Sequence, residues 1–420
     1  MSLIKWEKIA RDCADAYREA KGESGLIPAE ELSERIKFLS SGEDEDDLVQ
    51  RTLRTYKNDR VTTIGNCAFE ECSSLTAVSF PTCISIGERA FQNCRYLTMV
   101  SFPVCKTIGY SAFQRCFSLI KASFPVCTTI RDYSFKSCSA LTTISFPVCS
   151  NIGYAAFYDC SSLKEANFPN CESISADAFY NCSALTTISF PVCSSIGKSA
   201  FYNCSSLKEA VFPTCLSIES SAFYNCTSLI EANFPVCTYI GGSAFGKCSA
   251  LIEANFPVCT TISGTAFSNC NALTTVDFPA CKSIGANAFY SCTFLIEANF
   301  PVCTTIGYGA FGKCSALTTI SFPVCSSINT ETFLSCTSLV EANFPVCTYI
   351  GYGAFQGCTS LTTISLGAPT ICTLYNSLAF SKTAIASGAG YIYVPSSMVE
   401  SYKKATNWAY FSSVIRPIEE

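Results

Sequence analysis

The sequence predicts a solenoid of stacked coils whose strands form a parallel β-sheet, and three observations support this prediction. Shifted by 22 residues, the chain matches itself from Val61 to Leu366, and the period never slips. Each copy contains a segment rich in β-branched residues that alternates inward and outward, such as Leu185 to Phe190. A proline usually follows and ends the strand, because it lacks the backbone donor. A 22-residue unit cannot bury its apolar side alone, so neighbouring copies must stack.

The repeat consensus is I-G-x-x-A-F-x-x-C-x-x-L-x-x-[IVA]-x-F-P-x-C-x-x, and phenylalanine recurs from Phe69 to Phe355 in fourteen copies. These residues resemble the BspA-type leucine-rich repeats, whose signature is a Leu-x-x-Leu-x-Leu-Pro strand followed by Ile-Gly-x-x-Ala-Phe-x-x-Cys-x-x-Leu. Here Phe replaces the last strand leucine, Ile, Val or Ala replaces the middle one, and an extra Cys follows the proline. The resemblance covers about three quarters of the chain. It implies a leucine-rich-repeat solenoid, a right-handed superhelix with the parallel β-sheet on the concave face, made mostly of strand and loop.

The segments that flank the repeats predict caps, because an open terminal coil would expose its core and its strand edge. Apolar residues at helical spacing, and Pro28 before a second helix, predict a helical N-terminal segment. The acidic run from Glu43 to Asp47 is typical of a linker, and Leu48 to Tyr56 is expected to be the strand that starts the stack. The predicted organisation is residues 1–42, the helical segment; 43–60, the acidic linker and capping strand; 61–366, the fourteen repeats; and 367–420, the C-terminal cap.

At the C-terminal end we expect a strand, then a serine-capped helix from about Ser397 to Ala405, with Trp408 covering the last coil. Residues 391–408 resemble the closing segment of repeat proteins from gut bacteria. The front segment, IARDCADAYREAKGESGLIPAEELSERI, resembles a short helical module of phage and prophage tail-associated proteins from gut bacteria. These resemblances imply a place on a cell surface or on a phage-like particle.

Composition narrows the classes of partner. Hydrophobic residues make up 49% of the chain and charged residues 15%, so the chain buries a large core and is not disordered. The net charge is −5, and no basic stripe suits nucleic acid. No stretch reaches the 18 or more apolar residues of a membrane span, and the N-terminus lacks the apolar core of a secretory signal. We expect a protein or carbohydrate ligand, with neither nucleic-acid binding nor membrane insertion.

The cysteines recur at half the length of the repeat. From Cys72 to Cys358 one occurs every 11 residues, and only Cys13, Cys67 and Cys372 of the 30 cysteines lie outside the series. The cysteines therefore form two columns half a coil apart, which suggests either a redox or metal ladder or a pair of packing columns. No C-x-x-C motif and no histidine is present to complete a mixed zinc site, and free cysteine packs well in cores. We predict reduced, buried packing columns without metal.

The sequence does not indicate an enzyme. Histidine, the common general base, is absent, and no cysteine has an evident partner that would lower its pKa. The carboxylates recur with the repeat, whereas a catalytic site is a singular feature. No phosphate-binding glycine loop is found. We expect no catalytic residues and no cofactor.

The outward positions of the strands offer a first candidate binding face. Where Ile188 and Phe190 point inward, Thr187 and Ser189 point outward, and other copies place Glu and Asn at these positions. Such a face either binds a protein or glycan or only keeps the chain soluble. The candidate residues of this face are Glu165, Asn167, Glu231, Asn233, Glu253, Asn255, Glu297 and Asn299, with Glu341 and Asn343 in the same pattern.

A second candidate is a row of tyrosines in four consecutive copies, each directly after the conserved phenylalanine. Tyrosine joins apolar area to a polar tip and is enriched at interfaces. The alternative is that the rings stack between coils and bind nothing. The residues of the row are Tyr158, Tyr180, Tyr202 and Tyr224.

Two functional hypotheses are compatible with these patterns. The first is a non-catalytic recognition or adhesion solenoid that binds host or cell-surface protein or glycan through repeated weak contacts. The second is a structural spacer of a surface or phage-like particle, with no ligand on the repeats. Irregular residues concentrated on one face would favour binding, whereas a face as regular as the core would favour the spacer.

Overall fold

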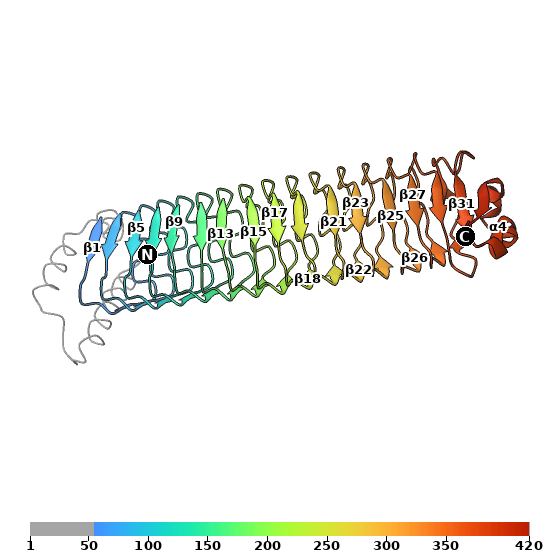
Figure 1. Ribbon diagram of the computed structural model, residues 1–420. Helices are drawn as coiled ribbons and strands as arrows, with labels where there is room; N and C mark the ends of the chain where they lie inside the picture. Colours follow the sequence, from blue (N-terminus) through green and yellow to red (C-terminus); the bar gives the residue numbers. More distant parts are fainter. Residues whose placement is uncertain (1–53, 420) are drawn as a thin grey trace, which may run out of the picture. The chain divides into compact units, whose positions relative to one another are not determined.

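The computed structural model describes residues 54–419, which belong to two compact units that meet in sequence at Cys193 and Ser194. Each unit is a stack of coils, and Figure 1 shows the strands of successive coils side by side. The predicted helical segment 1–42, the acidic run and the start of the capping strand lie outside the described residues.

In the first unit each coil contributes one three-residue strand, and these strands form parallel ladders of five and of two strands, in which partners lie 22 residues apart, as Thr55 and Ala77 do. The first strand that the structure describes is β1 (Thr55–Lys57), which overlaps the end of the predicted capping strand and pairs with β3 (Ala77–Ser79). These strands are β1 (Thr55–Lys57), β3 (Ala77–Ser79), β5 (Met99–Ser101), β7 (Lys121–Ser123), β9 (Thr143–Ser145), β11 (Glu165–Asn167) and β13 (Thr187–Ser189).

The second unit has parallel pairs with the same 22-residue spacing, such as Glu231 opposite Glu253, except at its end, where Thr363 lies opposite Tyr391 and Ile392 opposite Ile415. Its long strands are β15 (Glu209–Val211), β17 (Glu231–Asn233), β19 (Glu253–Asn255), β21 (Thr275–Asp277), β23 (Glu297–Asn299), β25 (Thr319–Ser321), β27 (Glu341–Asn343), β29 (Thr363–Ser365), β31 (Tyr391–Val394) and β32 (Ile415–Pro417). The predicted solenoid with a parallel sheet, mostly strand and loop, is confirmed.

A second ladder of two-residue strands runs beside the first, each ending on the buried isoleucine or leucine of its coil. In the first unit these strands are β2 (Thr63–Ile64), β4 (Ser85–Ile86), β6 (Thr107–Ile108), β8 (Thr129–Ile130), β10 (Asn151–Ile152) and β12 (Ser173–Ile174). In the second unit they are β14 (Ser195–Ile196), β16 (Ser217–Ile218), β18 (Tyr239–Ile240), β20 (Thr261–Ile262), β22 (Ser283–Ile284), β24 (Thr305–Ile306), β26 (Ser327–Ile328), β28 (Tyr349–Ile350) and β30 (Thr373–Leu374).

The Phe-Pro-x-Cys segment forms the turn between the two ladders. In a typical coil the Cys237 N–H donates to the Phe234 carbonyl at 3.2 Å, which closes a four-residue β-turn. Proline suits the second place of such a turn, because its fixed φ matches the turn and its missing N–H is not required there. Proline therefore both ends the long strand and starts the change of direction.

The Ala-Phe side of each coil turns through residues with positive φ, such as Ser243 at 57° and Lys247 at 61°. In this turn every second N–H points toward the next coil. The Phe245 N–H donates to the Ala266 carbonyl at 2.7 Å, and the Lys247 N–H to the Ser268 carbonyl at 2.8 Å. These bonds form a third ladder, so three sides of the coil carry backbone hydrogen bonds between coils.

The core is built on two columns of phenylalanine. Within a column the rings are nearly parallel, as for Phe234 and Phe256 with centres 5.2 Å apart and planes at 5°. Between columns the rings meet edge to face, as for Phe234 and Phe245 at 5.9 Å and 70°. Both arrangements are favourable for aromatic quadrupoles. Each Phe ring is thus held by its equivalents in the coils before and after it.

The C-terminal cap closes the second unit, and Trp408 covers the last coils as predicted. Its ring is buried, its Nε1 donates to the Cys372 carbonyl at 2.6 Å, and its centre lies 6.1 Å from that of Phe380. The cap is built from η1 (Ser377–Phe380), η2 (Ser396–Met398), α4 (Val399–Lys404) and η3 (Ala409–Val414), together with β31 and β32.

The predicted serine cap of the C-terminal helix is wrong. Helix α4 begins at Val399, and Met398, at its N-cap, makes no side-chain capping bond. Ser397 instead lies inside η2, a 3₁₀ turn that follows Pro395, so its backbone is already turned and its hydroxyl does not cap α4. The first turn of α4 holds Glu400, which pairs with Lys403 at 2.9 Å.

Replacing one core ring tests the importance of the aromatic columns. Phe234→Ala should lower the free energy of unfolding by about 3–5 kcal/mol, because the cavity lies between stacked rings that cannot collapse into it. The measurement is urea unfolding followed by circular dichroism. Val236→Ala, at a side chain that is 39% exposed, is the control, with a change within about 0.5 kcal/mol. Equal losses in the two variants would contradict the proposed importance of the columns.

A second substitution tests the left-handed positions. Arg115 has φ +60° and an exposed side chain, and its N–H donates to the Lys136 carbonyl at 2.8 Å. Arg115→Val should lower the free energy of unfolding by about 1–2 kcal/mol, because a β-branched residue is poorly accommodated at positive φ. Arg115→Gly should not destabilise the protein, since glycine adopts this conformation freely. Thermal unfolding of both variants checks this, and equal midpoints would contradict it.

Candidate ligand-binding face

The exposed face of the long strands brings three glutamates into direct register. Glu209, Glu231 and Glu253 lie opposite one another on β15, β17 and β19. Within residues 54–419 no lysine or arginine lies at ion-pair distance from these carboxylates. Like charges directly opposite each other on neighbouring strands destabilise a sheet. This acid row therefore weakens the fold that displays it.

Beside the acid row, β17 and β19 carry a pair of amides, and a related amide–carboxylate pair lies on β21 and β23. The Asn255 Nδ2 donates to the Asn233 Oδ1 at 3.0 Å, and the Asn299 Nδ2 donates to the Asp277 Oδ1 at 2.8 Å. An asparagine amide has two donor hydrogens and two acceptor lone pairs, and each such bond uses one of them on each side. Each bond therefore leaves further donor and acceptor capacity on the amide.

Exposed apolar side chains lie next to the acid row. Ile230 and Ile252, which directly precede the glutamates of β17 and β19, are 45% and 48% exposed, and Val211 on β15 is 43% exposed. Carboxylates, amides and branched apolar groups thus share the face of β15, β17 and β19, which we call the acid–apolar face. The isoleucines were not singled out from the sequence, although their place directly before Glu231 and Glu253 could have indicated them.

The other predicted strand residues are more dispersed. Glu341 on β27 lies between Thr319 and Thr363, and Asn299 on β23 lies opposite Ser321. In the first unit Glu165 and Asn167 on β11 lie opposite Thr187 and Ser189. Glu297 faces Thr275 of β21. The predicted set is therefore not one cluster, and its densest part is the acid–apolar face.

A break in the inner pattern of the sheet marks the acid–apolar face. Elsewhere the middle strand residue often alternates in size, as Ala342 lies between Ile320 and Ile364. On β15, β17 and β19 three alanines follow one another, namely Ala210, Ala232 and Ala254. The coils that carry Glu are those with Ala inside, so three such coils in sequence put three glutamates in line.

The predicted tyrosine row consists of stacked rings in each unit. In the first unit the ring centres of Tyr158 and Tyr180 lie 4.6 Å apart, and the ring planes are inclined by 2°. Lys136 Nζ lies 4.5 Å from the ring centre of Tyr158. Burial is the main cause that raises the pKa of Tyr158. In the second unit Tyr202 and Tyr224 are 5.0 Å apart. These ring faces contact each other, so they present mainly edges and hydroxyls.

The end of the second stack is closed by glycine and lysine. A Cβ on Gly246 would lie 2.9 Å from Tyr224 Cδ2, so the ring lies over a residue that has no side chain. Lys247 Nζ then lies 5.4 Å from the ring centre, in a cation–π arrangement. The stack thus ends on side chains of its own chain.

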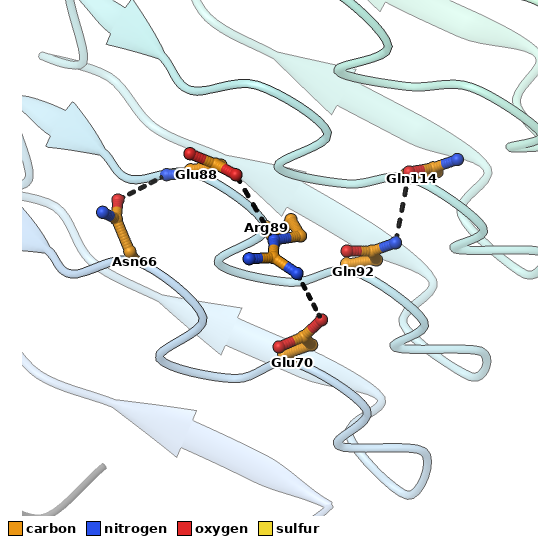
Figure 2. A network of polar contacts seen from close by, with 6 residues as sticks. All are labelled: Asn66, Glu70, Glu88, Arg89, Gln92 and Gln114. Carbon is orange, nitrogen blue, oxygen red and sulfur yellow. Dashed lines mark hydrogen bonds and ion pairs between the residues drawn. The ribbon is translucent and has the colours of Figure 1, made fainter. Parts of the chain in front are cut away.

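The equivalent position in the earlier coils supports a packing role for this column. Figure 2 shows Gln92 beside Gln114, and the Gln92 Nε2 donates to the Gln114 Oε1 at 3.2 Å. Glu70, one coil earlier in the same column, pairs with Arg89 at 3.8 Å. Amide pairs, ion pairs and stacked rings occur in turn at this position, and each links one coil to the next.

A different tyrosine cluster was not predicted from the sequence. Tyr133 meets Tyr110 edge-on at 5.2 Å and Tyr154 at 5.1 Å. A hydrogen bond with Asp177 is the main cause that raises the pKa of Tyr154 to about 12. Tyr133 lies two residues before the conserved Phe of its repeat, whereas Tyr110 and Tyr154 lie three residues before it. A search for residues at one repeat position therefore could not place the three rings in one cluster.

The cysteine columns within residues 54–419 are buried, as predicted. Both columns also donate hydrogen bonds to the backbone. Cys248 Sγ donates to the Phe223 carbonyl at 3.1 Å, and Cys237 Sγ donates to the Tyr239 carbonyl at 3.2 Å. Cysteine therefore fills a small space and also satisfies a carbonyl group, which alanine could not do.

The described residues contain no group of three or more Cys, Asp or Glu side chains arranged to hold a metal ion. None of the helices in residues 54–419 has the length and apolar character that crossing a lipid bilayer requires.

Coils of this length, with one long strand each and buried Leu, Phe and Ile columns, define a leucine-rich-repeat protein. The chain belongs to the BspA-type leucine-rich repeat family, because the model described as "BspA type Leucine rich repeat region (6 copies)" matches residues 62–186, 172–296 and 282–405. No curated protein matches the sequence.

Solved structures of bacterial repeat proteins are similar to this chain. A leucine-rich repeat protein from Bacteroides ovatus is 26% identical, with 74% of this chain and 86% of that chain covered and a TM-score of 0.55. A leucine rich cell surface protein from Faecalibacterium prausnitzii is 22% identical over 74% of this chain and 87% of that chain, with a TM-score of 0.38. The first of these supports the fold described above.

The buried thiols predict a loss of stability in alkali. Burial raises the pKa of Cys248 and of Cys292 to about 12 and that of Cys237 to about 11. In the unfolded chain a thiol titrates near pH 8.5. Below that pH both states are protonated and the stability is complete. Above it only the unfolded state loses protons, so the free energy of unfolding should fall until the folded pKa is reached.

Thermal unfolding at about pH 8 and about pH 10.5, at equal ionic strength and with a reducing agent, measures this effect. The midpoint should be clearly lower at the higher pH. Iodoacetamide should leave these thiols unmodified in the folded protein at both pH values and alkylate them in urea. An unchanged midpoint, together with alkylation of the folded protein, would contradict the effect of burial.

Proposed function

We propose that this chain is a non-catalytic recognition protein that binds a protein partner through the acid–apolar face. The observation that carries the proposal is the row of Glu209, Glu231 and Glu253, which stand in register, with no lysine or arginine of residues 54–419 at ion-pair distance. A partner that brings lysine or arginine to this row would relieve the repulsion between the carboxylates. Binding would therefore remove the repulsion between the carboxylates that destabilises the free protein, and this gain would contribute to the affinity.

The neighbouring groups favour a polypeptide over a glycan as the partner. Ile230, Ile252 and Val211 expose apolar area. Apolar side chains of a polypeptide partner could cover this area and remove it from water. The amides of Asn233 and Asn255 can bond backbone groups of an extended segment. A basic segment with apolar residues suits all three features. The proposed partner is a host or cell-surface protein, so that binding amounts to adhesion. We propose that the chain is displayed on a cell surface or on a phage-like particle.

A structural spacer is the second candidate function. The paired tyrosines and the glutamine pair at the equivalent position favour it, because these side chains link coils to each other. In that case the strand face would only be solvated. The two candidates differ in whether the acid row contacts another molecule.

Binding to an array of purified extracellular proteins and glycans tests the proposal, with a triple variant Glu209→Gln, Glu231→Gln and Glu253→Gln. The variant should bind its strongest protein ligand roughly tenfold more weakly, since each exposed charge pair contributes about 0.5 kcal/mol. Higher salt should weaken the wild-type complex and have less effect on the variant. Glu219→Gln, an exposed carboxyl outside the long strands, is the matched control and should bind as the wild type does.

The array also separates the alternatives. If the intact protein binds no member, the spacer is favoured. If the triple variant keeps full affinity while Tyr158→Ser, Tyr180→Ser, Tyr202→Ser and Tyr224→Ser together remove binding, the tyrosine row is the site and the acid–apolar face is not. If only glycans bind, the assignment to a protein partner is wrong.

A further inference from the structure

The last repeat departs from the cysteine period at one place. The column that follows Phe-Pro advances by 22 residues up to Cys347, but the next cysteine, Cys372, comes 25 residues later. The strand pairing shifts by a different amount, since Tyr349 lies opposite Thr373, 24 residues later. Cys347 lies two residues before Tyr349, whereas Cys372 directly precedes Thr373. The second cysteine is therefore displaced by one residue relative to the strand pairing.

This displacement brings the two sulfur atoms together. The Sγ atoms of Cys347 and Cys372 lie 3.7 Å apart, and both side chains are buried. Regular members of the column donate to the carbonyl two residues on, as Cys325 does to Ser327 at 3.2 Å. Cys372 lacks that geometry, since its contact with the Thr373 carbonyl is 3.9 Å long. Its thiol is directed to the other sulfur instead.

We propose that Cys347 and Cys372 form a disulfide bond when the protein meets a low-molecular-weight disulfide such as oxidised glutathione. A disulfide needs sulfurs about 2.05 Å apart and α-carbons about 4.4–6.8 Å apart. Neighbouring strands lie about 4.8 Å apart, and a displacement of one residue adds about 3.3 Å along the strand, so the α-carbons are expected roughly 5.8 Å apart, which meets the second requirement. The requirement on the sulfurs is not met at 3.7 Å, so the two Sγ atoms must move closer together. Rotation of the two side chains can bring them to bonding distance.

The two thiols of the pair differ in how readily they lose a proton. A hydrogen bond from Cys372 is the main cause that lowers the pKa of Cys347, whereas that hydrogen bond and burial raise the pKa of Cys372. Regular members of the column behave differently, since burial raises the pKa of Cys303 to about 12. Cys347 is thus the thiol that more readily becomes the nucleophilic thiolate.

The exchange takes place in two steps. The Cys347 thiolate attacks one sulfur of oxidised glutathione, which forms a mixed disulfide and releases one glutathione thiolate. Cys372 then loses its proton and attacks the Cys347 sulfur, which forms the protein disulfide and releases the second glutathione. The two protein thiols are oxidised by two electrons, and one oxidised glutathione is reduced to two glutathione molecules.

The bond would tie the last repeat to the place where the cap docks. The Cys372 carbonyl accepts from Trp408 Nε1 at 2.6 Å, and its N–H donates to Tyr402 Oη at 2.8 Å. Cys372 is therefore already fixed on both sides by buried cap residues. A covalent link to Cys347 would hold the cap on the stack, and the cap must open locally for the oxidant to reach the buried thiols.

The test incubates the full chain with oxidised glutathione, including a series at temperatures just below the unfolding midpoint, where the cap opens. Free thiols are then blocked in denaturant, and chymotrypsin cuts the chain after Tyr349 and Leu366, which places the two cysteines in different peptides. Mass spectrometry should find these peptides linked. The oxidised protein should unfold roughly 5 °C above the reduced protein.

Variants make the assignment specific. Cys372→Ser should lose both the linked peptide and the rise in midpoint, and Cys372→Ala is the second variant if the serine form does not fold. Cys325→Ser, one coil earlier in the same column, should keep both. The proposal is overturned if the Cys347–Cys372 peptide is absent from the wild type throughout the series. It is equally overturned if links are spread evenly along the columns, or if the rise in midpoint persists without Cys372.

Discussion

The constraint on which the rest of the structure depends is that each residue lies against its own counterpart in the next coil. A period that never slips places phenylalanine on phenylalanine and cysteine on cysteine, and the backbone bonds follow the same spacing. Side chains that attract their own kind gain from this arrangement, as stacked rings and amide ladders do. Carboxylates lose by it. The acid row is the clearest place where the repeat opposes stability, and for that reason it carries the functional proposal.

The features that the sequence predicted correctly are those that the period repeats. The stacked coils, the parallel ladder and the two buried cysteine columns all follow from residues such as Phe234, Pro235 and Cys237, whose neighbours are their own copies. Trp408 could also be placed, since an open end of a stack needs a large apolar cover. In each case one physical requirement determined one type of residue.

What could not be predicted depends on small displacements from the period. Tyr133 completes an aromatic cluster from a different place in the repeat, and Cys372 meets Cys347 because strand register and cysteine spacing diverge by one residue. The left-handed positions were hidden for another reason. They hold residues as different as Arg115 and Glu331, because the backbone is fixed there by bonds to the next coil and not by the side chain.

The constant spacing also affects how such a gene can change its length. Since the pattern of contacts between coils recurs with the 22-residue period, removal or duplication of a whole coil by unequal recombination leaves each surviving contact with an equivalent partner. A change of one or two codons would shift every later residue out of its column. The three alanine coils at β15, β17 and β19 show that two coils of the same kind can stand next to each other. Such an exchange would shorten or lengthen the acid row in steps of one carboxylate.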